Sequence, residues 1–153
     1  MAVIHSGSRG LGHQVCTDHV RRLESTYRQR NGAWVNDTWG YELPDRQLAS
    51  APVHSQEGQA YLDAMNAAAN YAFANRAVLA ERLRTVLRLE LGVDGEARTV
   101  YDVAHNIAKI EHHNIGGKGC TCCVHRKGAT RAFSAEHGEV AKAFETTGQP
   151  VIV

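Results

Sequence analysis

The chain has 153 residues, of which 43% are hydrophobic and 22% charged, and its formal net charge is +1. This length fits about one domain, and the composition is that of a globular protein, which excludes a disordered tail, a coiled coil and a collagen-like repeat. No apolar run reaches the ~20 residues of a membrane helix, and the small net charge means that any nucleic-acid site must be a local basic patch.

A glycine-rich turn at residues 6–12 opens the chain and leads into a helical pattern. Apolar residues recur three to five positions apart from Leu11 to Tyr27, which predicts a helix. Asn31 and Gly32 follow, and both tolerate the left-handed conformation that often ends a helix. We therefore expect the first helix to end at this pair.

A long helical region follows a segment that looks irregular. Residues 33–54 contain two prolines and three aromatic anchors, whereas residues 55–91 have a helical pattern that is rich in alanine. One straight helix of this length would measure on the order of 55 Å. Either this helix is broken, or the chain is part of something larger.

The last third of the chain is predicted to mix short strands with turns. Strands are expected at 99–103, 121–124 and 150–153, a turn with a short helix at 104–113, a glycine-rich loop at 114–118 and a short helix at 139–144. The separated strands and the helices together predict an α+β fold, with mixed short strands and one long alanine-rich helical region.

The cysteines indicate a reducing compartment. Cys120, Cys122 and Cys123, here called the cysteine cluster, lie within four consecutive positions, where paired disulfides are geometrically awkward. The first residues lack the basic and apolar regions of a signal peptide. We therefore expect reduced thiols in a cytoplasmic protein that has no membrane partner.

The glycine-rich turn is the first candidate for chemistry. Its glycines let backbone amides face an anion, and the helix that follows presents its positive end to the same place. Arg9 adds a side chain that can bind phosphate through two hydrogen bonds. The alternative interpretation is an ordinary tight turn before a helix.

A second candidate is the basic segment 125–131 (HRKGATR). The lysine and the two arginines suit phosphate oxygens, and the glycine allows close approach. The alternative is a solvated basic loop without a ligand.

A histidine and the cysteine cluster are candidates for metal binding. His105 could ligate a metal with Asp102 or Asn106 behind it, although a lone histidine can equally be a hydrogen-bonded structural residue. The cysteine cluster is too tightly spaced for a usual zinc site, so small reduced side chains in a strand are the simpler interpretation. The sequence has neither the G-x-S-x-G elbow of hydrolases nor a nucleotide-hydrolysing P-loop.

Several segments, taken together and in order, are more specific than any one of these motifs. They are 5–14 (HSGSRGLGHQ), 43–48 (LPDRQL), 65–76 (MNAAANYAFANR), 101–109 (YDVAHNIAK), 125–133 (HRKGATRAF) and 148–152 (GQPVI). They resemble signatures of the RtcB family of RNA-splicing ligases, and the resemblance covers essentially the whole chain. It implies that the chain has part of the RtcB-type fold.

The resemblance also implies an activity. Members of that family join RNA 3′-phosphate or 2′,3′-cyclic phosphate ends to 5′-hydroxyl ends in tRNA splicing and RNA repair, using GTP and manganese(II). A histidine is guanylylated, GMP passes to the RNA 3′-phosphate, and the 5′-hydroxyl then displaces it. The implied partner is therefore an RNA with a 3′-phosphate or cyclic phosphate end.

Six residues of this chain acquire roles from the resemblance. Imidazole is a suitable manganese ligand, and a metal would neutralise charge on the phosphates. The implied roles are manganese ligation by His5 and His105, an RNA phosphate grip by Arg9, a place in the same pocket for Asn106, and phosphate or nucleotide contacts by Lys127 and Arg131.

Parts of the family pattern have no match in this chain. The metal-binding Asp and Cys and the Gly-Asn-His-Phe segment are expected upstream, and the guanylylated histidine belongs to a Cys-His-Gly-Ala-Gly-Arg segment expected downstream. We therefore expect residues 1–153 to be a single partial domain, a central segment truncated at both ends, with no catalytic residue of its own. Such a chain would be inactive unless a second chain carried the missing segments. The alternatives are a non-catalytic RNA- or phosphate-binding module and a degenerate remnant.

Overall fold

A computed structural model describes residues 2–92 and 97–150 of the chain. The chain divides into two compact units, Met1–Ala97 and Arg98–Val153. Within the described residues there are two α-helices and two small antiparallel sheets. This is the mixed α+β arrangement that the sequence predicts. Neither helix of the described part combines the length and the apolarity that crossing a membrane would require.

Two helices dominate the first unit, α1 (Arg9–Ser25) and α2 (Gln56–Leu91). α2 is one unbroken helix of 36 residues, so the idea of a broken helix is wrong. Its ends explain its bounds: the Ser55 hydroxyl accepts a hydrogen bond from the Gly58 N–H at 3.0 Å, as a helix N-cap does. At the other end Gly92, with φ 57°, takes the left-handed conformation of a C-terminal cap.

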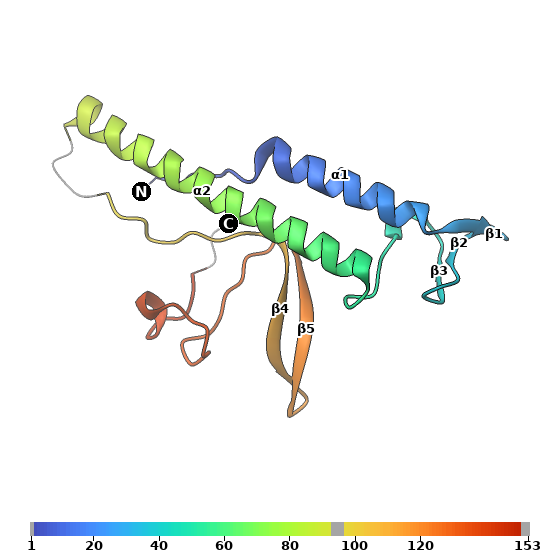
Figure 1. The fold of residues 1–153 in the computed structure, drawn as a ribbon. Coiled ribbons are helices and arrows are strands. Elements are labelled where there is room, and N and C mark those ends of the chain that lie inside the picture. The colour runs from blue at the N-terminus through green and yellow to red at the C-terminus, as the bar shows by residue number, and fades with distance from the viewer. Residues whose placement is uncertain (1, 93–96, 151–153) are drawn as a thin grey trace. The chain divides into compact units, whose positions relative to one another are not determined.

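The two helices run antiparallel and side by side (Figure 1). Small residues line their contact, because Ala68 and Ala72 of α2 are buried. A Cβ added to Gly12 of α1 would lie 3.7 Å from the Cβ of Ala68. Further along, the rings of His19 and Tyr61 have their centroids 5.6 Å apart. The alanine-rich composition of the long helix is thus explained by a close helix–helix approach.

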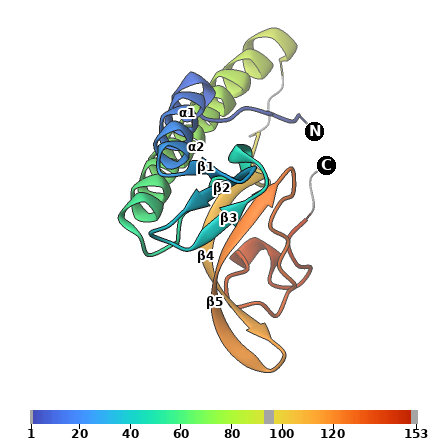
Figure 2. The same cartoon turned by 90° about the vertical axis from the view of Figure 1, so that its right-hand side faces the viewer.

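A three-stranded antiparallel sheet lies between the two helices in the sequence (Figure 2). Asn31 and Gly32, with φ 52° and 83°, form the two-residue turn of a hairpin, in which both positions need positive φ. The prediction that this pair ends the first helix is therefore wrong, and residues 33–54 are not irregular throughout. The strands are β1 (Arg28–Arg30), β2 (Ala33–Asn36) and β3 (Tyr41–Leu43), and a 3₁₀ turn follows at Arg46–Leu48.

A small core joins this sheet to the end of α1. Leu23, Tyr27 and Val35 are its buried side chains. The Tyr27 hydroxyl donates to the carbonyl oxygen of Ser50 at 2.6 Å. The amide of Asn36, which is only 2% exposed, donates to the Thr26 hydroxyl at 2.9 Å.

The second unit is built on one long hairpin, β4 (Asn106–Ile115) and β5 (Lys118–Lys127). The strands pair antiparallel in continuous register from Asn106 opposite Lys127 to Ile115 opposite Lys118. Gly116 and Gly117, with φ 59° and 81°, form the turn, where glycine takes positive φ without steric cost.

This hairpin confirms one sequence prediction and overturns two. The strand predicted at 121–124 lies inside β5. The turn and short helix predicted at 104–113 are wrong, because this segment is mostly β4. The strand predicted at 99–103 is also wrong, since no strand among the described residues pairs with it.

Two further predictions concern the end of the chain. In the range 139–144, for which a short helix was expected, the structure has a 3₁₀ helix at Lys142–Phe144. A strand was also predicted at 150–153. Of these residues only Pro150 belongs to the described part of the chain.

Candidate functional site

The glycine-rich turn of the first unit is held in place by the side chains of α2. The Asn75 amide donates to the Ser6 hydroxyl and to the Gly7 carbonyl oxygen, both at 3.0 Å. Arg76 donates to the Ser6 carbonyl oxygen at 3.2 Å. Two neighbouring residues of the long helix thus fix the backbone of the turn just before α1 begins.

Arg9 begins α1 with an unusual backbone. Its φ is 53°, a left-handed conformation that arginine rarely adopts. Its side chain is exposed, and no hydrogen bond or ion pair of this side chain is found within residues 2–92 and 97–150. The guanidinium therefore stays available to an anion beside the turn, at the end of a helix that favours negative charge.

The glycine at position 12 leaves room for the start of this helix. A Cβ at Gly12 would clash with the Ser8 hydroxyl and would lie 3.0 Å from the Ser8 Cβ. Ser8 precedes the helix without forming a side-chain cap. The close approach of Ser8 therefore explains why position 12 is a glycine.

In the second unit, Asn106 closes the open end of the hairpin. Its side-chain oxygen accepts a hydrogen bond from the Gly128 N–H at 2.9 Å, and its strand position lies opposite Lys127. Gly128 has φ 68°, so a glycine suits this bend. Asn106 and Lys127 are both exposed and are neighbours at one end of the hairpin. The place of Asn106 in one pocket with the histidines and Arg9 stays a prediction.

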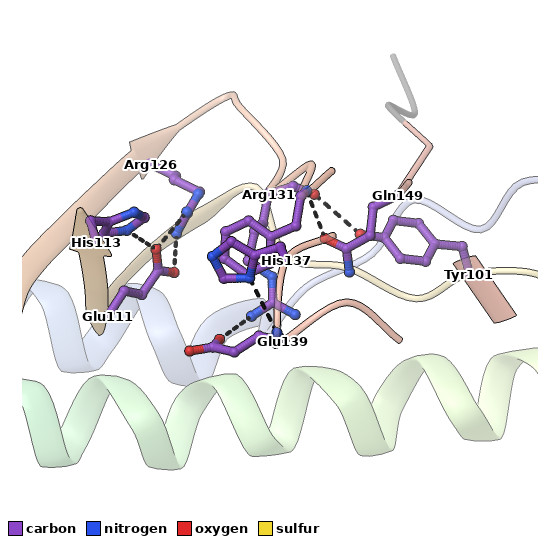
Figure 3. A network of polar contacts seen from close by, with 9 residues as sticks. Tyr101, Glu111, His113, Arg126, Arg131, His137, Glu139 and Gln149 are labelled. Carbon is purple, nitrogen blue, oxygen red and sulfur yellow. Dashed lines mark hydrogen bonds and ion pairs between the residues drawn. The ribbon is translucent and has the colours of Figure 1, made fainter. Parts of the chain in front are cut away.

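A buried ion pair stabilises the middle of the same hairpin (Figure 3). Arg126 donates two hydrogen bonds to Glu111, at 2.6 and 2.9 Å, and the His113 ring lies 3.0 Å from the same carboxylate. Glu111 is only 3% exposed. The hydrogen bonds from Arg126 lower the pKa of Glu111 to about 2, against the opposing effect of burial. The Glu111 hydrogen bonds in turn raise the pKa of Arg126.

The ion pair removes Arg126 from the basic segment as a ligand-binding group. Its side chain is 12% exposed, and both of its terminal nitrogens already donate to the Glu111 carboxylate. Of the lysine and the two arginines at 125–131, Lys127 is the one that is exposed and for which no ion pair is found in the described part of the chain.

Arg131, which lies near His137 and Glu139 in Figure 3, belongs to a loop organised around Phe133. Its guanidinium lies 4.6 Å from the centroid of the Phe133 ring and 3.4 Å from a carboxylate oxygen of Glu139. The His137 ring stacks on the Phe133 ring, with the two centroids 3.6 Å apart. The Tyr101 hydroxyl donates to the Arg131 carbonyl oxygen at 3.2 Å. Arg131 therefore has a structural role, whatever ligand it also contacts.

The two expected manganese ligands lie in different units. His5 precedes the glycine-rich turn in the first unit, and His105 precedes β4 in the second. Their meeting at one metal stays a prediction. Within residues 2–92 and 97–150, no group of three or more His, Cys, Asp or Glu side chains is arranged to hold a metal ion. The cysteine cluster lies on β5 with free thiols.

Three residues with clear structural roles escaped the sequence analysis. Asn75 and Arg76 are the last residues of segment 65–76, and the sequence of that segment does not indicate their hydrogen bonds to residues about 70 positions earlier. Glu111 was missed because residues 104–113 were predicted as a turn and a short helix, so no partner across a strand pair was expected for its carboxylate. The order Glu111–His113 on one strand and Arg126 on the next was the available signal.

Comparisons with known proteins agree on one family. A family model described as "tRNA-splicing ligase RtcB" matches residues 1–153. An RNA-splicing ligase RtcB of Mycobacterium tuberculosis is 50% identical over 151 residues, which cover 99% of this chain and 32% of the relative. A tRNA-splicing ligase RtcB of Archaeoglobus fulgidus is 47% identical over 154 residues, covering 99% of this chain and 30% of the relative. The chain thus spans about a third of the length of these relatives.

Proposed function

Because the chain belongs to the RtcB family of tRNA-splicing ligases, we propose that it forms part of an RNA ligase. The ligase would join RNA 3′-phosphate or 2′,3′-cyclic phosphate ends to 5′-hydroxyl ends in the cytoplasm. The observation that carries this proposal is an identity of 47–50% to named RNA ligases along nearly the whole chain. The chain spans about a third of these relatives, so the rest of the machinery would come from elsewhere.

The chain's contribution in this proposal is to bind and orient phosphate. Arg9 would grip an RNA phosphate beside the turn that Asn75 holds, because an exposed guanidinium at a helix start suits an anion. Asn106 and Lys127, at the end of the hairpin, would bind a phosphate of the nucleotide or of the RNA. Hydrogen bonds fix the backbone at the glycine-rich turn and at the end of the hairpin. This supports the proposed role, because donors that need no rearrangement stabilise a bound phosphate most.

His5 and His105 would ligate manganese(II). Neutral imidazole is a common metal ligand, but manganese prefers carboxylate, carbonyl and water oxygens, so the two histidines would supply only part of a manganese site. They do not fit it in number, because the described residues contain no group of three potential ligands. When bound, manganese would neutralise negative charge on the GTP triphosphate and on the activated RNA phosphate. The remaining ligands would have to come from the parts of a ligase that this chain does not match.

A chimeric ligase tests the proposal. In the Mycobacterium tuberculosis relative, the 151 aligned residues are replaced by this chain, and joining of an RNA 3′-phosphate to a 5′-hydroxyl is measured with GTP and manganese. We expect the chimera to ligate RNA. His5→Ala and His105→Ala should each reduce the rate by at least about a hundredfold, because even the outer partners of metal ligands are worth 10–100-fold.

His54→Ala is the matched control, because His54 is exposed and lies outside the candidate site; it should leave the rate unchanged. A chimera that folds but does not ligate would contradict the proposal. If the isolated chain then still bound RNA 3′-phosphate ends, the non-catalytic binding module would replace it.

A further inference from the structure

Two side chains from distant parts of the second unit hold the backbone around Arg131. Figure 3 shows these side chains, Tyr101 and Gln149, together with Arg131. The Tyr101 hydroxyl donates to the Arg131 carbonyl oxygen at 3.2 Å. The Gln149 side-chain oxygen accepts from the Phe133 N–H at 3.1 Å, and the Gln149 N–H donates to the Phe133 carbonyl oxygen at 2.9 Å. These hydrogen bonds fix the main chain that carries the Arg131 side chain.

Both supporting residues are themselves anchored. The rings of Tyr101 and Phe144 meet edge to face, with their centroids 5.4 Å apart. The Phe144 carbonyl oxygen accepts a hydrogen bond from the Gly148 N–H at 2.8 Å, and Gln149 is only 9% exposed. A Cβ at Gly148 would lie 3.2 Å from the Phe133 carbonyl oxygen. A glycine at this position therefore lets the end of the chain approach the loop closely.

The Arg131 guanidinium is oriented but still accessible. It lies 4.6 Å from the centroid of the Phe133 ring. Its Nη1 donates to Glu139 at 3.4 Å, which is long for a hydrogen bond. Within the described parts of the chain no second acceptor of the guanidinium is found, and the side chain is 26% exposed. Because a guanidinium has five N–H donors, several remain for an anion.

We propose that Tyr101 and Gln149 are positioning residues, which hold Arg131 in the orientation that binds a phosphate group of the substrate. This assignment rests on the proposed function, because the resemblance implies a phosphate contact for Arg131 and no role for the other two. Each of the three lies in a segment that carries the resemblance, and hydrogen bonds join these segments at one loop. Donors that are already in place stabilise a bound anion most.

The chimeric ligase can test this assignment, because KM is measured separately for GTP and for an RNA that ends in a 3′-phosphate. Arg131→Ala should raise one of these KM values at least about tenfold. The substrate affected identifies the phosphate that Arg131 binds. Tyr101→Phe and Gln149→Leu should each raise the same KM by about three- to tenfold. Both should leave kcat unchanged, since they weaken binding and not the chemical step.

A double-mutant cycle separates positioning from a general loss of structure. Added to Arg131→Ala, Tyr101→Phe should raise KM no further, because residues that act through one another are not additive. Tyr71→Phe is the matched control, since it removes the same hydroxyl from an exposed position of α2; it should change neither KM. If Gln149→Leu fails to fold, Tyr101→Phe decides, because it keeps the ring that packs on Phe144. Effects that multiply in the double variant, or unchanged KM values in Tyr101→Phe, would overturn the assignment.

A measurement on the isolated chain decides if the chimera does not ligate. Phenylglyoxal modifies accessible arginines, and mass spectrometry follows the peptide that contains Arg131. We expect GTP or the RNA 3′-phosphate to slow the modification of Arg131 in the wild type, and Tyr101→Phe to lose this protection. No protection in the wild type, or equal protection in both proteins, would show that Tyr101 does not position Arg131 for phosphate.

Discussion

Arg9 combines an exposed guanidinium with a backbone conformation that disfavours a side chain. Its φ of 53° places it in the left-handed region, which costs an ordinary residue roughly 1–2 kcal/mol. Such local strain is tolerated where a function requires the residue. The proposed phosphate grip would explain why an arginine and not a glycine stands here.

Arg9→Gly should therefore separate stability from binding. We expect the variant to raise the free energy of unfolding by about 1 kcal/mol, because glycine adopts positive φ freely, and to weaken binding of an RNA that ends in a 3′-phosphate. Urea unfolding and RNA titration at two salt concentrations measure the two effects. Arg9→Ala should lose the same RNA affinity without gaining stability. Equal RNA affinity of all three proteins would remove Arg9 from the phosphate site.

Glu111 links the stability of the hairpin to pH. Its pKa falls from an ordinary value of 4.5 to about 2 in the folded chain. Between these two pKa values the unfolded chain binds more protons than the folded chain, so the free energy of unfolding rises with pH. The contribution is complete above about pH 4.5 and is lost as the pH falls towards 2. The difference amounts to about 3 kcal/mol.

Glu111→Gln should remove most of this pH dependence. At pH 7 the variant should lose about 3 kcal/mol, because Arg126 would remain buried with its charge unpaired. Urea unfolding at pH 7 and pH 3 measures both effects. Glu139→Gln is the matched control, since its contact with Arg131 is more exposed and such pairs contribute little. A wild-type stability that is the same at pH 3 and pH 7 would contradict the role of Glu111.

At the scale of elements, the start of α2 depends on one glycine. Gly58 is buried in the first turn of the helix. A Cβ there would clash with the carbonyl oxygen of Pro52 and lie 3.2 Å from that of Val53. These are backbone atoms, so they cannot move aside as a flexible side chain would.

Gly58→Ala should consequently destabilise the chain by about 2 kcal/mol, the usual order for overpacking. Gly10→Ala is the contrasting change, because nothing lies within 4 Å of its added Cβ inside α1; it should stabilise by about 0.5–1 kcal/mol through helix propensity. Thermal unfolding of the two variants and of the wild type measures both changes in stability. Equal effects of the two substitutions would show that Pro52 and Val53 do not constrain the helix.

Helices could be predicted from this sequence better than hairpins. The apolar and alanine spacing of α2 repeats over ten turns, so its existence and bounds followed from local pattern. The pair Asn31–Gly32 is both a helix terminator and the preferred turn of a hairpin. Only the pairing of β1 with β2 separates these meanings, and pairing is not local information.

The strand β4 shows a second limit. Its inward positions include Glu111, which interrupts the apolar alternation expected of a half-buried strand. The interruption is compensated by Arg126, 15 residues later. Conversely, residues 99–103 have strand-like composition without a paired strand among the described residues, because composition alone supplies no partner.

At the scale of the whole molecule, the candidate site could be predicted only as a set of residues. The resemblance supplied Arg9, Asn106 and Lys127, and the structure places each at a fixed backbone feature. It could not supply the support from Asn75, which depends on the packing of α1 against α2. The pairing of His5 with His105 stays a prediction.

The groups that the 153-residue chain contains determine which chemistry it can perform alone. It contains no match to the Cys-His-Gly-Ala-Gly-Arg segment, to which the resemblance assigns a guanylylated histidine. Its described residues offer no group of three potential metal ligands. A covalent guanylate needs a positioned histidine and neutralised phosphate charge together, since positioning and electrostatic stabilisation carry most of phosphoryl-transfer catalysis.

We therefore expect the isolated chain to form no covalent bond to GMP and to ligate no RNA. The chain is incubated with labelled GTP and manganese, denatured, and examined for label that acid releases from the protein. A full-length relative treated in parallel should retain the label, which shows that the assay detects the bond. Mixing the isolated chain with that relative should add no label to the shorter chain. Acid-labile label on the 153-residue chain would mean that one of its own histidines or lysines accepts GMP, since both side chains give acid-labile phosphorus–nitrogen bonds. The assignment of this chain to a supporting role would then be wrong.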